Sequence, residues 1–233
     1  MYVRRWHPKV CNGKTALLIH GLASSSLTWL DLAKDLADLG YEVVAPDLSG
    51  HGKSPRKDSY SVKDWTSEIV ELGIKPNLIV GHSIGGLVAA NLYDFYPDSK
   101  IALLDPVFRL PRGILMNIVR TWFTMFNRRP FSKDYRMHLL DRSNARRWDT
   151  KSVMALAQPF EISKRFISEV SDALLIRAKR SYILPRLKDL PSGVLFETYN
   201  VGHNIHREAH MQLHNSLEQY LTREFTKTSP ITI

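Results

Sequence analysis

The stretch LIVGHSIGGLVAA, residues 78–90, decides the architecture of this 233-residue chain. Its first three residues are apolar and predict a short buried strand. The segment from Ile84 to Tyr96 is rich in apolar and small residues and is followed by Pro97, which predicts a helix. Glycines lie on both sides of Ser83, and small residues let a strand and a helix approach closely. The sequence therefore places Ser83 on a sharp turn between strand and helix.

The chemistry of such a turn depends on what activates the serine. A free serine hydroxyl is a poor nucleophile and needs a base, which a third group must hold in place. A Gly-x-Ser-x-Gly turn between a strand and a helix leaves the serine Oγ clear of the sheet. We therefore predict that Ser83 is a nucleophile. The alternative is a serine that only caps the helix.

Strands and helices alternate on both sides of this turn. Strands are predicted over 15–20, 41–45, 78–80, 101–104, 173–176 and 194–199, and helices over 26–39, 61–72, 84–96 and 206–221. Short connections and continuous apolar strands are typical of parallel sheets that are covered by helices on both faces. The predicted fold class is α/β, with a mostly parallel central sheet and flanking helices. Pro46 is expected to end the second strand.

The alternation stops after Asp105 and resumes near residue 172. We predict a core of residues 1–106 and 172–233 and a helical cap inserted over 107–171. Within 107–170, 13 Lys and Arg residues stand against five Asp and Glu residues, so this segment holds most of the net charge of +9. An apolar run, Ile114–Phe126, precedes several of these cations. Two interpretations stay open: a cap with its cations in water, or contact with a membrane surface. Nucleic acid is not expected, because no binding motif accompanies the charge.

Composition limits the remaining classes. Cys11 is the one cysteine, which excludes an intrachain disulfide and favours a reducing, cytoplasmic location. No apolar run approaches about 18 residues, so no membrane-spanning helix is expected. The basic N-terminal residues are not followed by an apolar stretch, and no signal peptide is expected.

Four blocks carry a resemblance to a known family. They are Leu18–Gly21, Pro46–Ser54, Gly81–Gly86 and Gly202–His206, in that order along the chain. With them the sequence resembles the α/β-hydrolase-fold superfamily of serine hydrolases and esterases. The resemblance covers roughly residues 14–106 and 172–222 and implies the same α/β architecture.

The resemblance also implies roles for other residues. The backbone N–H groups of Leu22 and Ile84 would form the oxyanion hole, and His203, after the last strand, would be the base. His20 and His82 are interpreted as structural neighbours of that hole. His206, His210 and His214 share the spacing of metal ligands, but polar surface positions are the favoured interpretation, and no metal is expected.

The carboxylate that should orient the base is not at its usual place. In much of the family it follows the penultimate strand, but residues 177–185 contain no Asp or Glu, and Tyr182 occupies this loop. A second family position is the end of the strand after the nucleophile helix, which is Asp105 here. Asp105 is therefore the predicted acid. The alternatives are a turn-forming Asp-Pro pair, Asp189 as the acid, or a dyad or inactive relative.

The expected reaction is hydrolysis of a carboxylic ester or a related lactone or thioester, through an acyl-enzyme on Ser83 and without a cofactor. An apolar small-molecule acyl substrate, with an anionic group favoured by the basic segment, would suit the site. Two alternatives stay open. One is hydrolysis of a carbon–carbon bond in aromatic ring-cleavage products. The other is a ligand-binding relative without turnover. The oligomeric state is left open.

Overall fold

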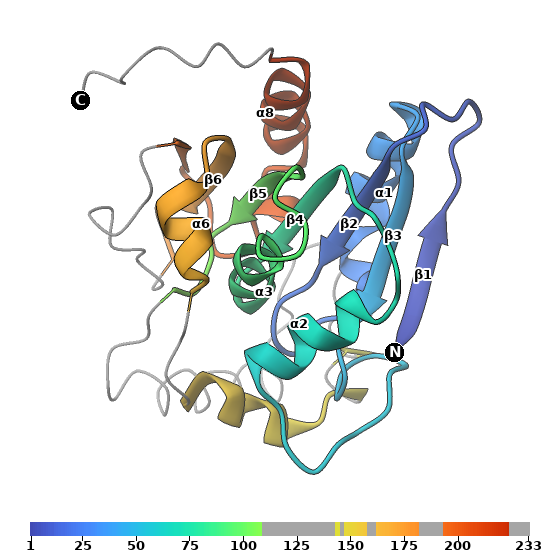
Figure 1. Ribbon diagram of the computed structural model, residues 1–233, viewed down its shortest axis with the longest axis vertical. Coiled ribbons are helices and arrows are strands. Elements are labelled where there is room, and N and C mark those ends of the chain that lie inside the picture. The colour runs from blue at the N-terminus through green and yellow to red at the C-terminus, as the bar shows by residue number, and fades with distance from the viewer. Residues whose placement is uncertain (109–142, 145–146, 158–161, 182–192, 224–233) are drawn as a thin grey trace.

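The computed structural model describes residues 1–108, 143–144, 147–157, 162–181 and 193–223. Its centre is a seven-stranded sheet in the order β1-β3-β2-β4-β5-β6-β7 (Figure 1). The strands are β1 Tyr2–Trp6, β2 Thr15–Ile19, β3 Glu42–Asp47, β4 Leu78–His82, β5 Lys100–Leu104, β6 Ala173–Ala178 and β7 Val194–Tyr199. β1 runs antiparallel to β3, and the other pairings are parallel. The predicted α/β class with a mostly parallel sheet is confirmed.

Helices cover both faces of the sheet (Figure 1). They are the 3-10 helix η1 Ser26–Trp29, α1 Leu30–Asp38, α2 Val62–Val70, α3 Ile84–Leu92, the 3-10 helix η2 Thr150–Ala157, α6 Lys164–Glu169, α7 Ile205–Glu208 and α8 His210–Thr222. Along β2, Leu17 and Ile19 join the core under α2 and α3, whereas Ala16 and Leu18 join the core under α1 and α8. Both faces of β2 are therefore buried, which explains its continuous apolar sequence.

The edge strand β1 was not predicted, and the expectation that Pro46 ends the second strand was wrong. β3 continues through Pro46, which pairs with Val3 of β1. The parallel ladder between β2 and β3 involves only Glu42 to Val44 on the β3 side. Pro46 therefore lies beyond that ladder, where its missing N–H costs no parallel hydrogen bond.

The last predicted helix is divided in two. α7 ends at Glu208 and α8 begins at His210, with Ala209 between them in a non-helical conformation. As a result, His206 lies on α7, whereas His210 and His214 lie on α8. The expected shared face of all three histidines is not formed.

The predicted insertion, residues 107–171, lies largely outside the described residues, including the run Ile114–Phe126 and most of the basic side chains. Its described parts are anchored to the core. The Ser25 hydroxyl donates to Oδ1 of Asn144 at 2.7 Å, and the Tyr60 hydroxyl donates to Oδ2 of Asp149 at 2.8 Å.

Two further features concern the helices and the one cysteine. No helix among the described residues is long and apolar enough to cross a membrane. Cys11 is exposed and precedes β2. It therefore lies at the edge where the parallel strands begin, whereas Ser83 follows the last residue of β4 at the edge where they end.

Candidate active site

Ser83 occupies the turn between β4 and α3 with a strained backbone. Its φ is 57° and its ψ is −121°, in a region that L-residues rarely adopt. Hydrogen bonds hold this conformation: the Ser83 N–H donates to the Leu104 carbonyl at 3.0 Å, and the Ser83 carbonyl accepts from Gly86 at 3.0 Å and Val107 at 3.1 Å. The turn is thus fixed from both sides by β5 and the segment that follows it.

The glycines around Ser83 are required by close backbone contacts. A Cβ on Gly81 would lie 2.3 Å from the Gly85 carbonyl oxygen, and a Cβ on Gly85 would lie 2.4 Å from the Ile19 carbonyl oxygen. Both contacts are with main-chain atoms, which cannot move aside as a flexible side chain would. The spacing of glycines in the sequence is therefore explained by packing between α3, β4 and the end of β2.

His203 and Asp105 meet at the same edge of the sheet as Ser83. Nδ1 of His203 donates to Oδ2 of Asp105 at 2.6 Å, and the other oxygen, Oδ1, accepts from the Ala178 N–H at 3.2 Å. The Asp105 side chain is fully buried, and that of His203 is 25% exposed. With its proton on Nδ1, His203 keeps Nε2 free to accept a second one.

The strand order explains why an aspartate after β5 can reach this histidine. β5 lies between β4, which leads to Ser83, and β6, so Asp105 follows the neighbouring strand. Its N–H donates to the Ile176 carbonyl of β6 at 2.7 Å, and its φ is 44°. Asp172 is at the other end of β6, where it accepts from the Lys100 ammonium at 3.0 Å. The other acid candidate, Asp189, lies outside the described residues, as does Tyr182.

His82, directly before Ser83, lies between two other histidines. Its ring centroid is 4.6 Å from that of His203 and 4.6 Å from that of His206. Its Nε2 donates to the main-chain carbonyl of His203 at 2.8 Å. Burial, assisted by the neighbouring histidine charges, holds the pKa of His82 well below its usual range, and burial does the same for the pKa of His206. His82 and His206 are therefore neutral neighbours of His203.

The other histidines of the C-terminal region have partners that the sequence did not reveal. His206 is buried, so its interpretation as a polar surface position was wrong; its Nε2 lies 2.7 Å from the Thr28 hydroxyl and its ring 4.6 Å from that of Trp29. His210 and His214 both approach Oδ2 of Asp35 on α1, at 2.8 and 3.2 Å. Within the described part of the chain, no group of three or more His, Cys, Asp or Glu residues is arranged to hold a metal ion.

The two residues predicted to supply oxyanion donors lie beside Ser83. Ile84 is the first residue of α3, so its N–H lies among those that have no acceptor within the helix. Leu22 follows Gly21 in the loop after β2 and is 7% exposed. A Cβ on Gly21 would lie 3.0 Å from the Ser83 Cβ, which places the start of this loop against the serine.

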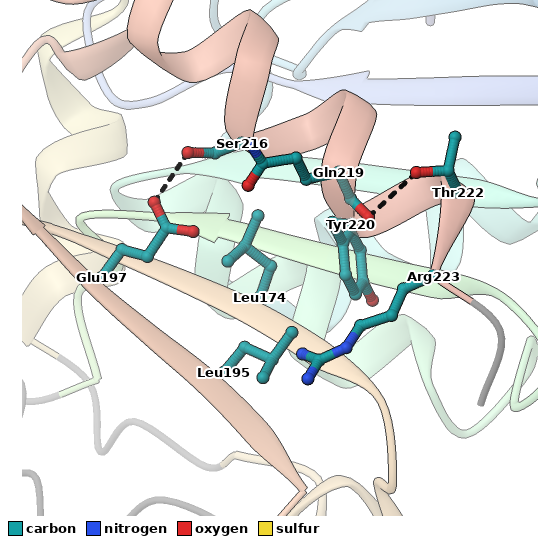
Figure 2. A pocket seen from close by; sticks show the side chains of 8 residues that line it. All are labelled: Leu174, Leu195, Glu197, Ser216, Gln219, Tyr220, Thr222 and Arg223. Carbon is teal, nitrogen blue, oxygen red and sulfur yellow. Dashed lines mark hydrogen bonds between the residues drawn. The ribbon is translucent and has the colours of Figure 1, made fainter. Parts of the chain in front are cut away.

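A groove of about 320 Å³ lies elsewhere, between β6, β7 and the end of α8 (Figure 2). Leu174 and Leu195 form its floor, and the Ser216 hydroxyl donates to Oε2 of Glu197 at 2.7 Å on its wall. None of the predicted site residues line it. Leu174 and Leu195 belong to the beginnings of their strands, so the groove lies toward the sheet edge opposite Ser83.

The sheet, the strained serine turn and the aspartate–histidine pair together define a class, that of α/β-hydrolase-fold proteins. Comparison with known families agrees with this. The model of the alpha/beta hydrolase family matches residues 16–218, and the chain belongs to that family.

The relatives include enzymes of several names. The chain is 33% identical over 125 residues to lipase LipV of Mycobacterium tuberculosis, covering 51% of this chain and 46% of the lipase. It is 40% identical over 104 residues to the probable protein phosphatase methylesterase 1 of Caenorhabditis elegans, covering 40% of this chain and 28% of that protein. The chain thus spans less than half the length of these curated relatives.

Solved structures share the fold over nearly the whole chain. An esterase from Exiguobacterium antarcticum has a TM-score of 0.76 at 16% identity and covers 95% of both chains. An enol-lactonase from Burkholderia xenovorans has a TM-score of 0.65 at 16% identity, covering 95% of this chain and 96% of its own. At these identities the likeness concerns the fold.

Proposed function

We propose that this chain is a serine hydrolase that cleaves a carboxylic ester, or a related lactone or thioester, through an acyl-enzyme on Ser83. The observation that carries the proposal is the 2.6 Å bond between His203 Nδ1 and Asp105 at the sheet edge where Ser83 stands on a strained turn. Relatives named as lipase, methylesterase, esterase and lactonase support acyl substrates.

The proposed mechanism assigns one step to each group. Oγ of Ser83 attacks the substrate carbonyl carbon while Nε2 of His203 takes the hydroxyl proton. Asp105 holds the histidine in the Nδ1–H tautomer and stabilises the imidazolium that forms. The N–H groups of Leu22 and Ile84 bind the oxyanion, and His203 returns its proton to the leaving group. Water, activated by the same histidine, then releases the acid and regenerates Ser83.

The proposal is tested with a panel of p-nitrophenyl esters of increasing acyl length, together with lactones and thioesters. A burst of p-nitrophenol is expected from the wild type, whereas Ser83→Ala should show none. Ser67→Ala, which changes an exposed serine on α2, serves as the matched control and should be fully active. Equal inactivity of wild type and Ser83→Ala across the whole panel would contradict the proposal.

A second measurement defines the nucleophile and the shape of its pocket without a known substrate. Fluorophosphonates of different chain length should label the wild type once, with the adduct on the peptide that contains Ser83. The preferred chain length then gives the acyl group to be tried. Labelling at another serine would contradict the assignment of Ser83 as the nucleophile.

A further inference from the structure

The peptide that joins Gly21 to Leu22 is the part of the site whose orientation matters most. A Cβ on Gly21 would lie 3.0 Å from the Ser83 Cβ and 3.1 Å from Nδ1 of His82, so a larger residue would have to push these side chains aside by a few tenths of an ångström. In a planar trans peptide the carbonyl and the N–H point in opposite directions. The direction of the Gly21 carbonyl therefore fixes the direction of the Leu22 N–H, the proposed oxyanion donor.

Glycine at this position leaves the peptide free to rotate. Without a Cβ, Gly21 has access to backbone conformations that other residues avoid, and rotation of the peptide costs little. Ala23, two residues after Gly21, has a φ of 54° in the left-handed region. The close approach to Ser83 therefore favours glycine at position 21. Glycine alone, however, would not hold the Leu22 N–H in one direction.

His20 supplies the missing restraint. Its Nδ1 donates to the Gly21 carbonyl at 2.7 Å, and the Ser24 N–H adds a longer bond at 3.3 Å. Nε2 of the same ring accepts from the Leu48 N–H at 3.0 Å. A main-chain N–H can only donate and a carbonyl can only accept, so these two bonds fix the ring as the Nδ1–H tautomer.

The ring is held firmly in that state. His20 is fully buried, and its ring centroid lies 5.2 Å from that of His51. Burial lowers the pKa of His20, although Asp47 acts in the opposite direction. The Leu22 N–H donates to no acceptor among the described residues, which leaves it available to a substrate oxygen.

We infer that His20 is a positioning residue that holds the Gly21–Leu22 peptide with the Leu22 N–H turned toward the oxyanion. It acts through the main chain and contacts no substrate atom. The inference rests on the proposed serine hydrolase function, and it assigns to His20 an effect on the rate of the chemical step rather than on substrate binding.

Two substitutions distinguish the effects of the two hydrogen bonds that the His20 ring makes, to Gly21 and to Leu48. In His20→Asn the amide nitrogen takes the place of Nδ1, so the bond to Gly21 can form and the bond to Leu48 is lost. In His20→Gln the amide oxygen takes the place of Nε2, so the bond to Leu48 can form and the bond to Gly21 is lost. Each variant removes one buried hydrogen bond, and similar losses of stability are expected.

The expected result is a difference in kcat. His20→Gln should lower kcat for the best p-nitrophenyl ester by about 100-fold with KM within about twofold, as loss of one oxyanion donor does. His20→Asn should stay within about fivefold of the wild type. Crystal structures should show a rotated Gly21–Leu22 peptide in His20→Gln and an unrotated one in His20→Asn.

Several outcomes would overturn the inference. If the wild type is active and Ser83→Ala is inactive, equal kcat values for the two His20 variants would refute the role of His20 and leave the proposed function intact. A wild type that neither hydrolyses esters nor labels at Ser83 would refute both. Should the variants not fold, the ¹⁵N spectrum of histidine-labelled wild type decides: the Nδ1–H tautomer is expected for His20, and the Nε2–H tautomer would refute the inference.

Discussion

Asp105 is the residue whose position is most informative. Its two carboxylate oxygens have separate partners, the imidazole of His203 and the Ala178 N–H, and its backbone is held in the left-handed region. A residue that served only as the first half of an Asp-Pro turn would need neither contact. The geometry therefore favours Asp105 as the carboxylate that orients His203 over Asp105 as a residue that only forms a turn.

Asp105→Asn is predicted to lower kcat for ester hydrolysis by about 100-fold or more. The amide cannot stabilise the imidazolium of His203, and as a donor it disfavours the Nδ1–H tautomer. The near-isosteric change should leave the fold intact, which circular dichroism and the unfolding midpoint would verify.

Asp172→Asn is the matched control for this change. Asp172 is also a partly buried carboxylate, but it lies directly before β6, at the opposite end of the strands from Asp105, and pairs with Lys100. The control should keep full kcat. If both variants turn over like the wild type, Asp105 is not the acid.

The roles of individual residues could be predicted from the sequence only where they form a motif with their neighbours in the chain or match a family pattern. Ser83, with its flanking glycines, follows from spacing. Asp105 was implied by the resemblance to the α/β-hydrolase fold, because it occupies that family's second position for the acid and residues 177–185 contain none. The contact of Asp35 with His210 and His214 joins α1 to α8 across the fold. No spacing rule connects residues so far apart in the sequence. The positions of His210 and His214 on a predicted helix therefore indicated only polar surface residues.

At the scale of elements, the start of α3 lies unusually close to the end of β2. Gly85 is the contact point, and a Cβ there would lie 2.4 Å from the Ile19 carbonyl oxygen and 2.5 Å from that of His20. This packing sets the distance between the nucleophile turn and the loop that carries Leu22. The two halves of the proposed oxyanion hole are thus positioned by one helix–strand contact.

Gly85→Ala is accordingly predicted to destabilise the protein by on the order of 3 kcal/mol, because two main-chain carbonyls would have to move. Gly73→Ala is the control. Its φ is +66° but nothing lies within 4 Å of the added Cβ, so only backbone strain of about 1 kcal/mol is expected. Urea unfolding of both variants measures the difference, and equal losses would show that space at Gly85 is not limiting.

Strands with a clear apolar pattern could be predicted from the sequence. A strand that forms because it pairs with a distant segment could not. β2, β4 and β5 are buried on both faces, and their apolar runs identified them. β1, Tyr2–Trp6, contains two arginines and is held chiefly by its antiparallel pairing with β3. The same pairing extends β3 through Pro46, so one missed strand accounts for both differences at this edge.

For the molecule as a whole, four buried histidines link stability to pH. Burial lowers the pKa of His20, His51, His82 and His206, and that of His51 falls to about 3. An unfolded histidine takes up its proton near pH 6.5, so below this value the unfolded chain binds more protons than the folded one. Stability should therefore be present above about pH 6.5 and be lost progressively as the pH falls toward 3.

The prediction is tested on His51, whose ring contacts Trp65 and which lies away from Ser83 in the sequence. Acidification from pH 7.5 to 5.5 should cost the wild type about 1 kcal/mol through this residue alone. His51→Phe keeps an aromatic ring and should lose less stability than the wild type over this interval, measured by urea unfolding at both pH values. Exchange of the exposed His7 for Phe is the control and should leave the pH dependence unchanged.

The position of Cys11 has a practical consequence. It is the one thiol of the chain, it is exposed, and it precedes β2 at the sheet edge opposite Ser83. A maleimide-coated bead or sensor chip would therefore capture every molecule through the same atom and in the same orientation. The immobilised layer would present the proposed catalytic edge outward, toward the flowing solution, without any engineered tag.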